Sequence, residues 1–384
     1  MSGAPHIMFA GGGAAGHLFP GLAVAEHLRE LMPAAQITFA GPGKAREKHA
    51  VRNAGYEHTT IPAQPIPQNP LQAFRFVTDN IAGYCAARWL LSEQQVSLVV
   101  GLGGFTSTAV VRAAAARGIP FILLEQNAIP SQTTRWLSRA ATLVCAAFEE
   151  VRPHLHVQAP VAVTGNPSRP AFEQLYDRRQ GVGANRFSDQ SNLRQKRLVV
   201  MGGAGGARSL NESMPAALQQ LGDCMAGWQV VHQTGEGQLQ ETETRYRDCG
   251  VDALAVTYID EIASVLFDSD LVVSRAGGTT LAELALAGIP AVLVPYPEAT
   301  DDHQLANAKV FSAAGACRLI DETSQAGALD KALARELSPL VIEETRRFEM
   351  NHRMQSLARP SAAADIAATV YESLYGAANT RVAA

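Results

Sequence analysis

The sequence predicts an α/β protein built from two Rossmann-like domains. Short apolar runs alternate with amphipathic helical segments along most of the chain, a pattern typical of βα units and a parallel sheet. A Gly-rich turn follows a predicted strand twice, at residues 11–16 and again at 202–206, which indicates that the same strand–turn–helix arrangement begins again in a second domain. The length of 384 residues suits two or three domains. We therefore expect two parallel sheets, each covered by helices.

The first half is expected to contribute six strands and a first helix. Each predicted strand is a run of mostly apolar or β-branched residues, bounded by turn residues. The strands are predicted at His6–Ala10, Gln36–Ala40, Leu98–Gly101, Pro120–Leu124, Leu143–Ala146 and Val161–Thr164, and the helix at 21–31.

The second half repeats the alternation after a polar, Arg-rich stretch at 177–196, which is interpreted as a surface insertion or linker. A helix is predicted from about Ser209. Strands are predicted at Arg197–Met201, Gln229–His232, Ala255–Tyr258, Leu271–Ser274, Ala291–Val294 and Cys317–Ile320. We expect an N-terminal domain over 1–166 and a C-terminal domain over 167–360. A last helix, within 361–384, is expected to pack back on the first domain.

Composition excludes several classes of protein. Apolar residues make up 47% of the chain, which is enough to build two cores and excludes a wholly disordered chain. The net charge of −4 disfavours a nucleic-acid partner, although residues 1–165 carry 12 basic and 9 acidic side chains, a net +3. The five cysteines show no metal-binding spacing and are expected to be reduced thiols of a cytosolic protein. We expect no signal peptide and only peripheral membrane contact.

The first Gly-rich turn, GGGAAGH at residues 11–17, follows a strand and opens a helix. Its glycines fit the dinucleotide pattern GxGxxG, but no acidic residue ends the next strand to bind a ribose, so NAD is disfavoured. A turn that binds nothing is an alternative. His17 stands at the helix entrance, where an imidazole suits a general base. A capping or merely exposed histidine is equally compatible with its position.

The segment SRAGGTTLAE at residues 274–283 offers a second kind of anion site. Thr279, Thr280 and the N–H groups of the helix could bind a diphosphate, and the Glu283 carboxylate could accept hydrogen bonds from both hydroxyls of a ribose. A capping arrangement with a favourably placed Glu is the structural alternative. Together with the turn at 202–206, this segment predicts ligands on both sides of one cleft between the domains.

Other polar segments carry weaker indications. The stretch from Pro295 to Ala308 is dense in polar groups but lacks a metal-binding order. The DSD triplet at 268–270 resembles a metal-binding DxD motif, yet it precedes a strand and lies away from the expected cleft, so we expect no metal. Arg169, in TGNPSR at the end of the first domain, suits a phosphate partner or a linker salt bridge.

Taken together, these segments resemble the MurG family of glycosyltransferases. The likeness rests on seven motifs in order: GGGAAGH, Gly103-Gly104, Glu125-Gln126-Asn127, Gly165-Asn166-Pro167, the turn at 202–208, the segment 275–283 and Asp302-His303-Gln304. The resemblance implies a two-domain GT-B fold facing a cleft, without a metal or other cofactor. It also implies inverting transfer of N-acetylglucosamine from its UDP derivative to the muramyl 4-hydroxyl of lipid I, which gives lipid II for peptidoglycan.

The resemblance also implies roles for individual residues. His17 becomes the candidate base, Ile259 lies against the uracil, Glu283 binds the ribose hydroxyls and Gln304 meets the sugar. The remaining positions implied to contact substrate are Ala14, Ala15, Gly16, Asn127, Arg169, Ala204, Arg275, Gly278, Thr279, Thr280, Leu281 and Ala282. Where the family usually has Thr-Gly and Ser, this chain has Ala14-Ala15 and Ala204. Backbone N–H groups would then replace those hydroxyls.

The implied lipid substrate agrees with a basic and apolar segment in the first half. The stretches 71–77 and 81–91 interleave apolar and basic residues at helical spacing, so they could lie on the anionic cytoplasmic face of the cell membrane. A buried core helix is the alternative. Arg135 and Arg139 could add contacts to lipid phosphates, and other cell-wall synthesis proteins are possible partners. Competing functions are a UDP-N-acetylglucosamine 2-epimerase of the same fold and a catalytically silent nucleotide-sugar-binding protein.

Overall fold

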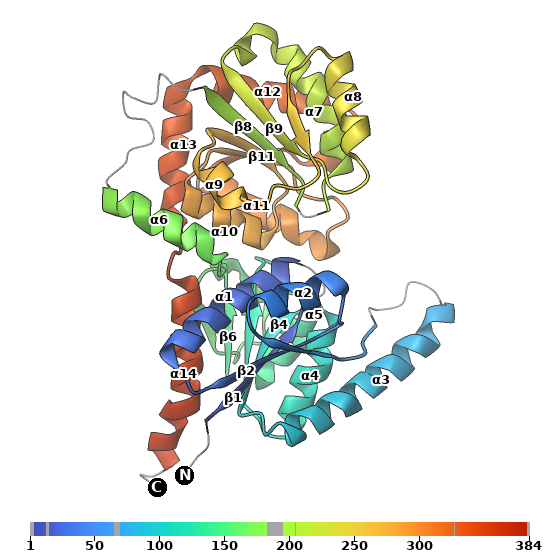
Figure 1. Ribbon diagram of the computed structural model, residues 1–384, viewed down its shortest axis with the longest axis vertical. Helices are drawn as coiled ribbons and strands as arrows, with labels where there is room; N and C mark the ends of the chain where they lie inside the picture. Colours follow the sequence, from blue (N-terminus) through green and yellow to red (C-terminus); the bar gives the residue numbers. More distant parts are fainter. Residues whose placement is uncertain are drawn as a thin grey trace. The chain divides into compact units, whose positions relative to one another are not determined.

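The computed structural model describes residues 4–12, 15–64, 70–182, 195–203, 205–325 and 327–381. The chain divides into two compact units, one formed by Met1–Arg169 with Ser361–Ala384 and the other by Pro170–Pro360 (Figure 1). The division falls after residue 169, against the expected boundary after residue 166. Each unit contains a sheet whose strand pairs are all parallel, so the two-domain α/β class predicted from the sequence is confirmed.

The first unit holds a seven-stranded sheet in the order β3-β2-β1-β4-β5-β6-β7. The strands are β1 His6–Gly11, β2 Gln36–Gly41, β3 Glu57–Thr60, β4 Leu98–Gly103, β5 Phe121–Glu125, β6 Leu143–Ala146 and β7 Val161–Val163. The helices are α1 Ala15–Leu31, α2 Ala45–Asn53, α3 Pro70–Glu93, α4 Phe105–Ala116, α5 Gln132–Leu137 and α14 Ala362–Arg381, with short 3₁₀ turns at Ser138–Ala140 and Glu149–His154.

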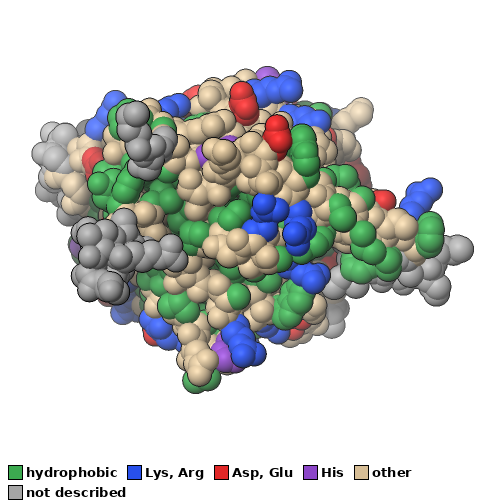
Figure 2. Space-filling model, turned by 90° about the horizontal axis from the view of Figure 1, so that it is seen from below, with side chains coloured by type: hydrophobic (Ala, Val, Ile, Leu, Met, Phe, Trp, Pro, Cys, Tyr) green, Lys and Arg blue, Asp and Glu red, His purple; other side chains and the backbone are tan. Residues whose placement is uncertain are grey.

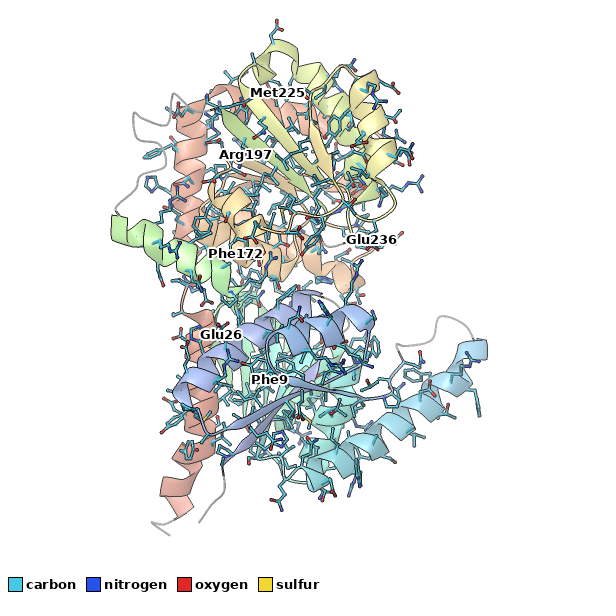
Figure 3. All side chains as sticks on the ribbon, viewed as in Figure 1. Phe9, Glu26, Phe172, Arg197, Met225 and Glu236 are labelled. Carbon is cyan, nitrogen blue, oxygen red and sulfur yellow. The ribbon has the colours of Figure 1, made fainter. Side chains whose placement is uncertain are left out.

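The alternation of side chains along β1 divides the first core into two layers. Ile7 and Phe9 pack on the side covered by α1 and α14, whereas Met8 and Ala10 pack on the side covered by α3 and α4. Phe9, labelled in Figure 3, stacks on Phe39 with ring centroids 5.0 Å apart. Both faces of β1 are therefore buried, as expected for a parallel strand between two helical layers.

The second unit holds a six-stranded sheet in the order β10-β9-β8-β11-β12-β13. The strands are β8 Lys196–Met201, β9 Trp228–Gln233, β10 Leu254–Val256, β11 Leu271–Ser274, β12 Ala291–Leu293 and β13 Cys317–Leu319. The helices are α6 Pro170–Val182, α7 Arg208–Leu221, α8 Leu239–Asp248, α9 Ile262–Phe267, α10 Gly278–Ala287, α11 His303–Ala313, α12 Leu329–Ile342 and α13 Glu344–Ser356, with 3₁₀ turns at Gly222–Met225, Thr300–Asp302 and Glu322–Gln325.

Three sequence predictions differ from the structure. Helix α1 begins at Ala15, six residues before the expected start at 21, so the helix follows the Gly-rich turn directly. Strand β3 was not predicted, since Glu57–Thr60 is polar and half exposed at the edge of the sheet. The polar stretch from 177 does not start as a linker, because α6 continues to Val182 from its buried anchor Phe172. Residues 183–194 of that stretch lie outside the described residues.

Candidate functional site

The carboxyl ends of β1 and β4 meet where the strand order of the first sheet reverses. Ligands of open α/β sheets bind at such a reversal, outside the carboxyl ends of the strands. Gly11 and Gly12 leave β1 with φ of +131° and +122°, and a Cβ on Gly11 would lie 2.5 Å from the Gly103 carbonyl oxygen. The backbones of the two loops therefore approach too closely for a side chain at position 11.

Residues 13 and 14, including the predicted contact Ala14, lie outside the described residues. Ala15 and Gly16 form the first residues of α1, and His17 follows them on the same turn. The backbone N–H groups of a first helical turn lack intrahelical acceptors, so this turn can bind an anion or an oxygen atom of a substrate. The predicted position of His17 at the helix entrance matches the structure.

The His17 imidazole is held by a side chain from the end of β5, which lies two strands away from β1 in the sheet. Its Nδ1 lies 3.0 Å from Oε1 of Gln126, which directly follows β5. The amide nitrogen of Gln126 faces two backbone carbonyls, donating to Leu102 at 3.2 Å and to Leu124 at 3.5 Å. Because those contacts require the NH₂ group on that side, Oε1 must accept, and His17 carries its proton on Nδ1. The Nε2 lone pair is then the one that can accept a proton.

Glu125 organises the loop after β5. Its Oε1 accepts hydrogen bonds from the backbone nitrogen of Asn127 at 3.2 Å and from the side-chain amide of Asn127 at 3.3 Å, while Oε2 accepts from the backbone nitrogen of Ser131 at 3.1 Å. The Glu125 side chain is buried. The predicted contact residue Asn127 is thus held by a carboxylate.

Arg169, the last residue of the first unit, lies beside α1. Its guanidinium carbon is 5.6 Å from the centroid of the Phe19 ring, a cation–π distance. Phe19 is two residues after His17 on α1. The structure therefore places the Arg169 guanidinium against the helix that carries the candidate base, within the same unit.

In the second unit the strand order reverses between β8 and β11, and both strands end in Gly-rich turns. Gly203 and Gly206 have φ of +82° and +75°, and a Cβ on Gly206 would lie 2.0 Å from the Thr234 carbonyl oxygen. Gln233 links this turn to Ile259, the residue predicted to lie against the uracil. The amide nitrogen of Gln233 donates to the Gly203 carbonyl at 2.8 Å, and its Oε1 accepts from the Ile259 backbone nitrogen at 3.2 Å. Ala204 lies outside the described residues.

Helix α10 starts directly after the turn that follows β11. Gly277 is its N-cap residue, and Gly278, Thr279 and Thr280 form its first turn, with both threonines half exposed. Glu283 lies further along the helix and is only 2% exposed. The predicted contact Leu281 is fully buried in the core, and its backbone nitrogen donates to Gly277. Ala282, beside it, is half buried.

Arg275 joins several elements of the second unit. Nη1 donates to the backbone carbonyls of Val294 and Pro295, both at 2.9 Å, and to the Glu322 carboxylate at 2.7 Å, while Nη2 donates to Ser209 Oγ at 2.9 Å. The side chain is buried. These contacts describe a side chain that ties the ends of β11 and β12 to neighbouring turns, although the resemblance implies a substrate contact here.

Gln304 lies in the first turn of α11. Its Oε1 accepts hydrogen bonds from the backbone nitrogens of Ala276 at 3.2 Å and Tyr296 at 3.0 Å. Its amide NH₂ group is consequently the part left to donate to a sugar hydroxyl or carbonyl. Gln304 therefore lies next to the turn that opens α10, as its predicted role requires.

The DSD triplet has a structural use in the described part of the chain. One carboxylate oxygen of Asp270 accepts a hydrogen bond from the Arg197 backbone nitrogen at 2.8 Å, and Ser269 is buried. Asp270 directly precedes β11, at the end of the sheet opposite to the Gly-rich turns. Across the described ranges, no three His, Cys, Asp or Glu side chains gather in a metal-binding arrangement.

Two residues of the site were not singled out from the sequence. Gln126 was included in a motif, but its contact with His17 was not predicted, and Gln233 was given no role. Both directly follow or end a strand next to a Gly-rich turn, so a polar residue at the carboxyl end of a strand was the available signal.

The comparison with known proteins agrees with this geometry. Residues 7–146 match the glycosyltransferase family 28 N-terminal domain, and residues 197–367 match the glycosyltransferase family 28 C-terminal domain. The crystal structure of Acinetobacter baumannii MurG aligns over 96% of this chain and 99% of that chain, with a TM-score of 0.74 and 26% identity. The fold is therefore that of a two-domain GT-B glycosyltransferase.

Curated relatives indicate to which family of glycosyltransferases the chain belongs. The UDP-N-acetylglucosamine--N-acetylmuramyl-(pentapeptide) pyrophosphoryl-undecaprenol N-acetylglucosamine transferase of Myxococcus xanthus is 35% identical over 94% of this chain and 91% of that protein. The protein of the same name from Geobacter sulfurreducens is 34% identical over 93% of this chain and 95% of its own length. The chain belongs to the MurG family of glycosyltransferases.

A UDP-N-acetylglucosamine 2-epimerase from Neisseria meningitidis also shares the fold. Its structure, bound to UDP-N-acetylglucosamine, has a TM-score of 0.65 and covers 96% of this chain, but only 14% of aligned residues are identical. At that identity the likeness concerns the fold alone.

Proposed function

We propose that this protein transfers N-acetylglucosamine from UDP-N-acetylglucosamine to the muramyl 4-hydroxyl of lipid I, with inversion at the anomeric carbon, and so makes lipid II for peptidoglycan. The observation that carries the proposal is the identity of about 35% to transferases of this name, spread over 94% of the chain. The His17 arrangement supports it, because a transferase of this kind needs a group that takes the proton of the attacking hydroxyl.

His17 acts as that base in the proposed mechanism. The muramyl hydroxyl gives its proton to Nε2 while its oxygen forms a bond to the anomeric carbon, and the bond from that carbon to the UDP oxygen breaks. Gln126 keeps Nδ1 protonated and the ring in place. As the imidazole gains its proton, the Gln126 oxygen lies where it can stabilise the charge that develops on the ring.

The second unit binds the donor in this proposal. The first-turn N–H groups of α10 at Gly278–Thr280 hold the diphosphate and stabilise the departing UDP. Glu283 accepts from the ribose hydroxyls, Ile259 lies against the uracil and the Gln304 amide donates to the sugar. Arg169, Asn127, Ala204 and the turn of residues 14–16 complete the donor contacts by their likeness to the family motifs. No cofactor is needed for these roles.

We also propose that the protein works at the cytoplasmic face of the cell membrane as a peripheral protein. Helix α3 exposes apolar side chains. Among them are Phe74, which is 76% exposed, and Trp89, which is 65% exposed, and each is next in sequence to an exposed arginine, Arg75 or Arg88. The face drawn in Figure 2 shows hydrophobic and basic side chains next to one another. Such a mixed surface binds the interface of an anionic bilayer.

Contacts between helices extend this surface beyond α3. The Arg112 guanidinium of α4 lies 5.7 Å from the Tyr84 ring of α3 and 4.7 Å from the Trp136 ring of α5, and Trp136 is 60% exposed. Arg139, three residues after Trp136, is exposed. Arg135, just before Trp136, is half buried and donates to the Pro130 carbonyl. Within the described residues, no helix combines the length and apolar character needed to cross a bilayer. Other cell-wall synthesis proteins are proposed partners on the same membrane.

The test is incubation of the full chain with labelled UDP-N-acetylglucosamine and a short-chain lipid I analogue. We expect one disaccharide product for each UDP released, and a loss of at least about 100-fold in kcat for His17→Ala. His27→Ala is the matched control, because His27 lies further along the same helix, where its Nδ1 is 3.9 Å from the Glu30 carboxylate. Unchanged turnover in His17→Ala would remove His17 from the role of base.

The same assay without lipid separates the competing functions. A 2-epimerase would convert the nucleotide sugar to its epimer with no lipid present, and a silent binding protein would bind the donor without transferring or hydrolysing it. We expect neither result. Product formation that depends on lipid would support the transferase.

A further inference from the structure

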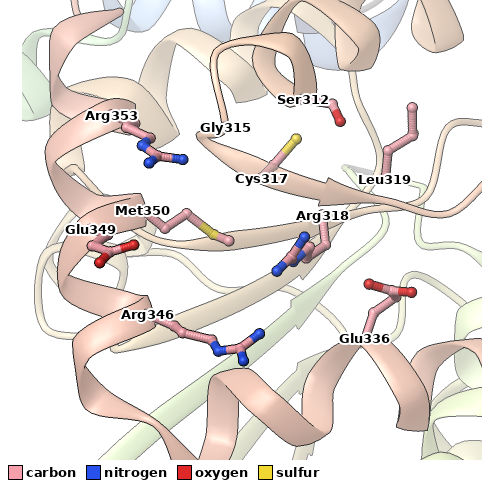
Figure 4. Close-up of a pocket in the computed structure, with 10 residues that line it drawn as sticks. All are labelled: Ser312, Gly315, Cys317, Arg318, Leu319, Glu336, Arg346, Glu349, Met350 and Arg353. Carbon is pink, nitrogen blue, oxygen red and sulfur yellow. The ribbon is translucent and has the colours of Figure 1, made fainter.

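A polar pocket lies in the second unit, along the edge strand β13 of its sheet. It has a volume of about 390 Å³, which is in the range of small-molecule sites. It is formed where the end of α11, the turn that follows it, strand β13, Glu336 of α12 and one face of α13 meet (Figure 4). The lining residues are Ser312, Gly315, Cys317, Arg318, Leu319, Glu336, Arg346, Glu349, Met350 and Arg353.

Three arginines face this pocket from two elements. Arg346 and Arg353 lie two turns apart on one face of α13, and Arg318 projects from β13 toward them (Figure 4). Arg346 already pairs with Glu343 at 2.7 Å. Arg318 and Arg353 have no side-chain hydrogen bond or ion pair with any residue in the described ranges, and the Nε atom of Arg318 is buried without a hydrogen-bond partner. Neither of these two guanidiniums is paired with a carboxylate of the described residues, so an anion in the pocket would be stabilised by charge-assisted hydrogen bonds.

The backbone at Gly315 leaves room for the Arg353 side chain. Gly315 has a φ of +70°, and a Cβ at this position would lie 2.4 Å from Nη1 of Arg353. A side chain at residue 315 would therefore displace the guanidinium from the pocket. The arrangement of Arg353 depends on this glycine rather than on a salt bridge.

The other lining groups limit what kind of anion fits. Burial raises the pKa of the Cys317 thiol to about 12, so the thiol adds no negative charge. Glu336 accepts from Arg335 at 3.1 Å, which leaves the Glu349 carboxylate as an acceptor for hydroxyl or amide hydrogens. Met350 and Leu319 supply apolar surface. A phosphate that carries a small hydroxylated group satisfies all these side chains, whereas a bare ion leaves Glu349 and the apolar wall unused.

We propose that this pocket binds a small organic phosphate of sugar-phosphate size, with the phosphate between Arg318 and Arg353. The site is separate from the proposed donor site, because none of its lining residues belongs to the Gly-rich turns after β8 and β11 or to α10. The proposal does not depend on the transferase activity.

The experiment measures binding to the full chain by calorimetry, first without UDP and then with saturating UDP to fill the nucleotide site. The probes are N-acetylglucosamine 1-phosphate, inorganic phosphate and neutral N-acetylglucosamine. We expect the sugar phosphate to bind at least about fivefold more tightly than inorganic phosphate, and the neutral sugar not to bind. Equal affinity for the two phosphates would overturn the assignment of an organic ligand. Loss of sugar-phosphate binding when UDP is added would place it in the nucleotide site and overturn the proposal.

Variants locate the binding. Arg318→Gln and Arg353→Gln are each expected to weaken sugar-phosphate binding at least tenfold, and Gly315→Ala to weaken it through Arg353. Arg245→Gln is the matched control, because this substitution removes the same charge from the second unit, while Arg245 lies on α8 and neither it nor its partner Glu241 lines the pocket. Arg353→Lys, which keeps the charge without the fork of donors, should bind at intermediate strength. Unchanged binding in folded Arg318→Gln and Arg353→Gln proteins would refute the site.

Discussion

Nδ1 of His17 lies 3.0 Å from Oε1 of Gln126, and the amide nitrogen of Gln126 is in turn engaged by the carbonyls of Leu102 and Leu124. This chain of contacts fixes both the direction of the amide and the tautomer of the imidazole. The proton acceptor is then Nε2, on the side of the ring away from Gln126. The proposed chemistry of His17 therefore depends on a residue 109 positions away in the sequence.

Replacing Gln126 tests this dependence. Gln126→Leu should lower kcat by about 10- to 100-fold while the KM for UDP-N-acetylglucosamine changes less than about twofold, because the ring loses its orientation but the donor site is intact. Gln126→Glu keeps an acceptor and adds a negative charge, so it should retain more activity and move the rise of the pH–rate profile to higher pH. Steady-state kinetics across pH check both variants. Equal kinetics in Gln126→Leu and the parent protein would contradict the positioning role.

Gly103→Ala should disturb the same ring next to its Nδ1 atom. A Cβ at residue 103 would lie 3.0 Å from Nδ1 of His17, and φ there is +93°. Gly118→Ala is the matched control, since Gly118 also has positive φ, at +67°, but has open space around its Cβ position. We expect both variants to lose some stability and only Gly103→Ala to lose kcat. Comparable kcat values after correction for folded protein would argue against crowding of His17.

The surface around α3 should bind anionic membranes. Ile81→Glu and Trp89→Glu each place a charge on an exposed apolar position, 59% and 65% exposed, and should reduce co-sedimentation with vesicles containing anionic lipid several-fold. Val157→Glu is the control, because Val157 is also an exposed apolar residue of the first unit but lies outside α3 to α5. Activity toward a short-chain, soluble acceptor should not change. Binding that is indifferent to both α3 variants would exclude this surface.

Arg275 should act mainly through stability. Removing one partner of a buried, hydrogen-bonded ion pair costs about 3–5 kcal/mol, so Arg275→Met should destabilise the second unit by this order, and Glu322→Gln by less because Glu322 is more exposed. Urea unfolding can be followed by Trp228 fluorescence in a Trp89→Phe, Trp136→Phe background, where Trp228 is the only tryptophan left. A folded Arg275→Met protein that keeps its stability and raises the donor KM would instead indicate a substrate contact.

His232 should make the second unit sensitive to acid. Burial lowers its pKa to about 3, and its ring nitrogens contact Asn211 and Tyr246 at 2.9 and 2.8 Å. The unfolded chain binds a proton near pH 6.5, so the stabilising contribution of neutral His232 is present above that pH and is lost as pH falls toward 3. We expect a slope of about 1.4 kcal/mol per pH unit from this group over that window.

His232→Gln removes that titration. Its free energy of unfolding, measured between pH 6.5 and 5 in the same single-tryptophan background, should fall less steeply than that of the parent. Parallel curves for the two proteins would show that His232 does not set the acid sensitivity. Because both proteins share every other titrating group, the difference between the curves isolates residue 232.

The sequence alone determined the α/β class, the positions of most strands, the Gly-rich turns and the candidate base His17. These features depend on short-range rules: apolar strands alternate with helices, and glycine is needed where a strand turns sharply into a helix. The polar edge strand β3 and the early start of α1 were missed, because neither shows an apolar period in the sequence.

Only the tertiary structure decided which side chains meet. The partnership of Gln126 with His17, the four contacts of buried Arg275 and the arginine pocket beside β13 all join residues distant in the chain. Such contacts follow from strand order, which places β1 beside β4 and β8 beside β11 although neither pair is consecutive. Local patterns carry no information about that order, because sheet neighbours are selected by packing of the whole unit.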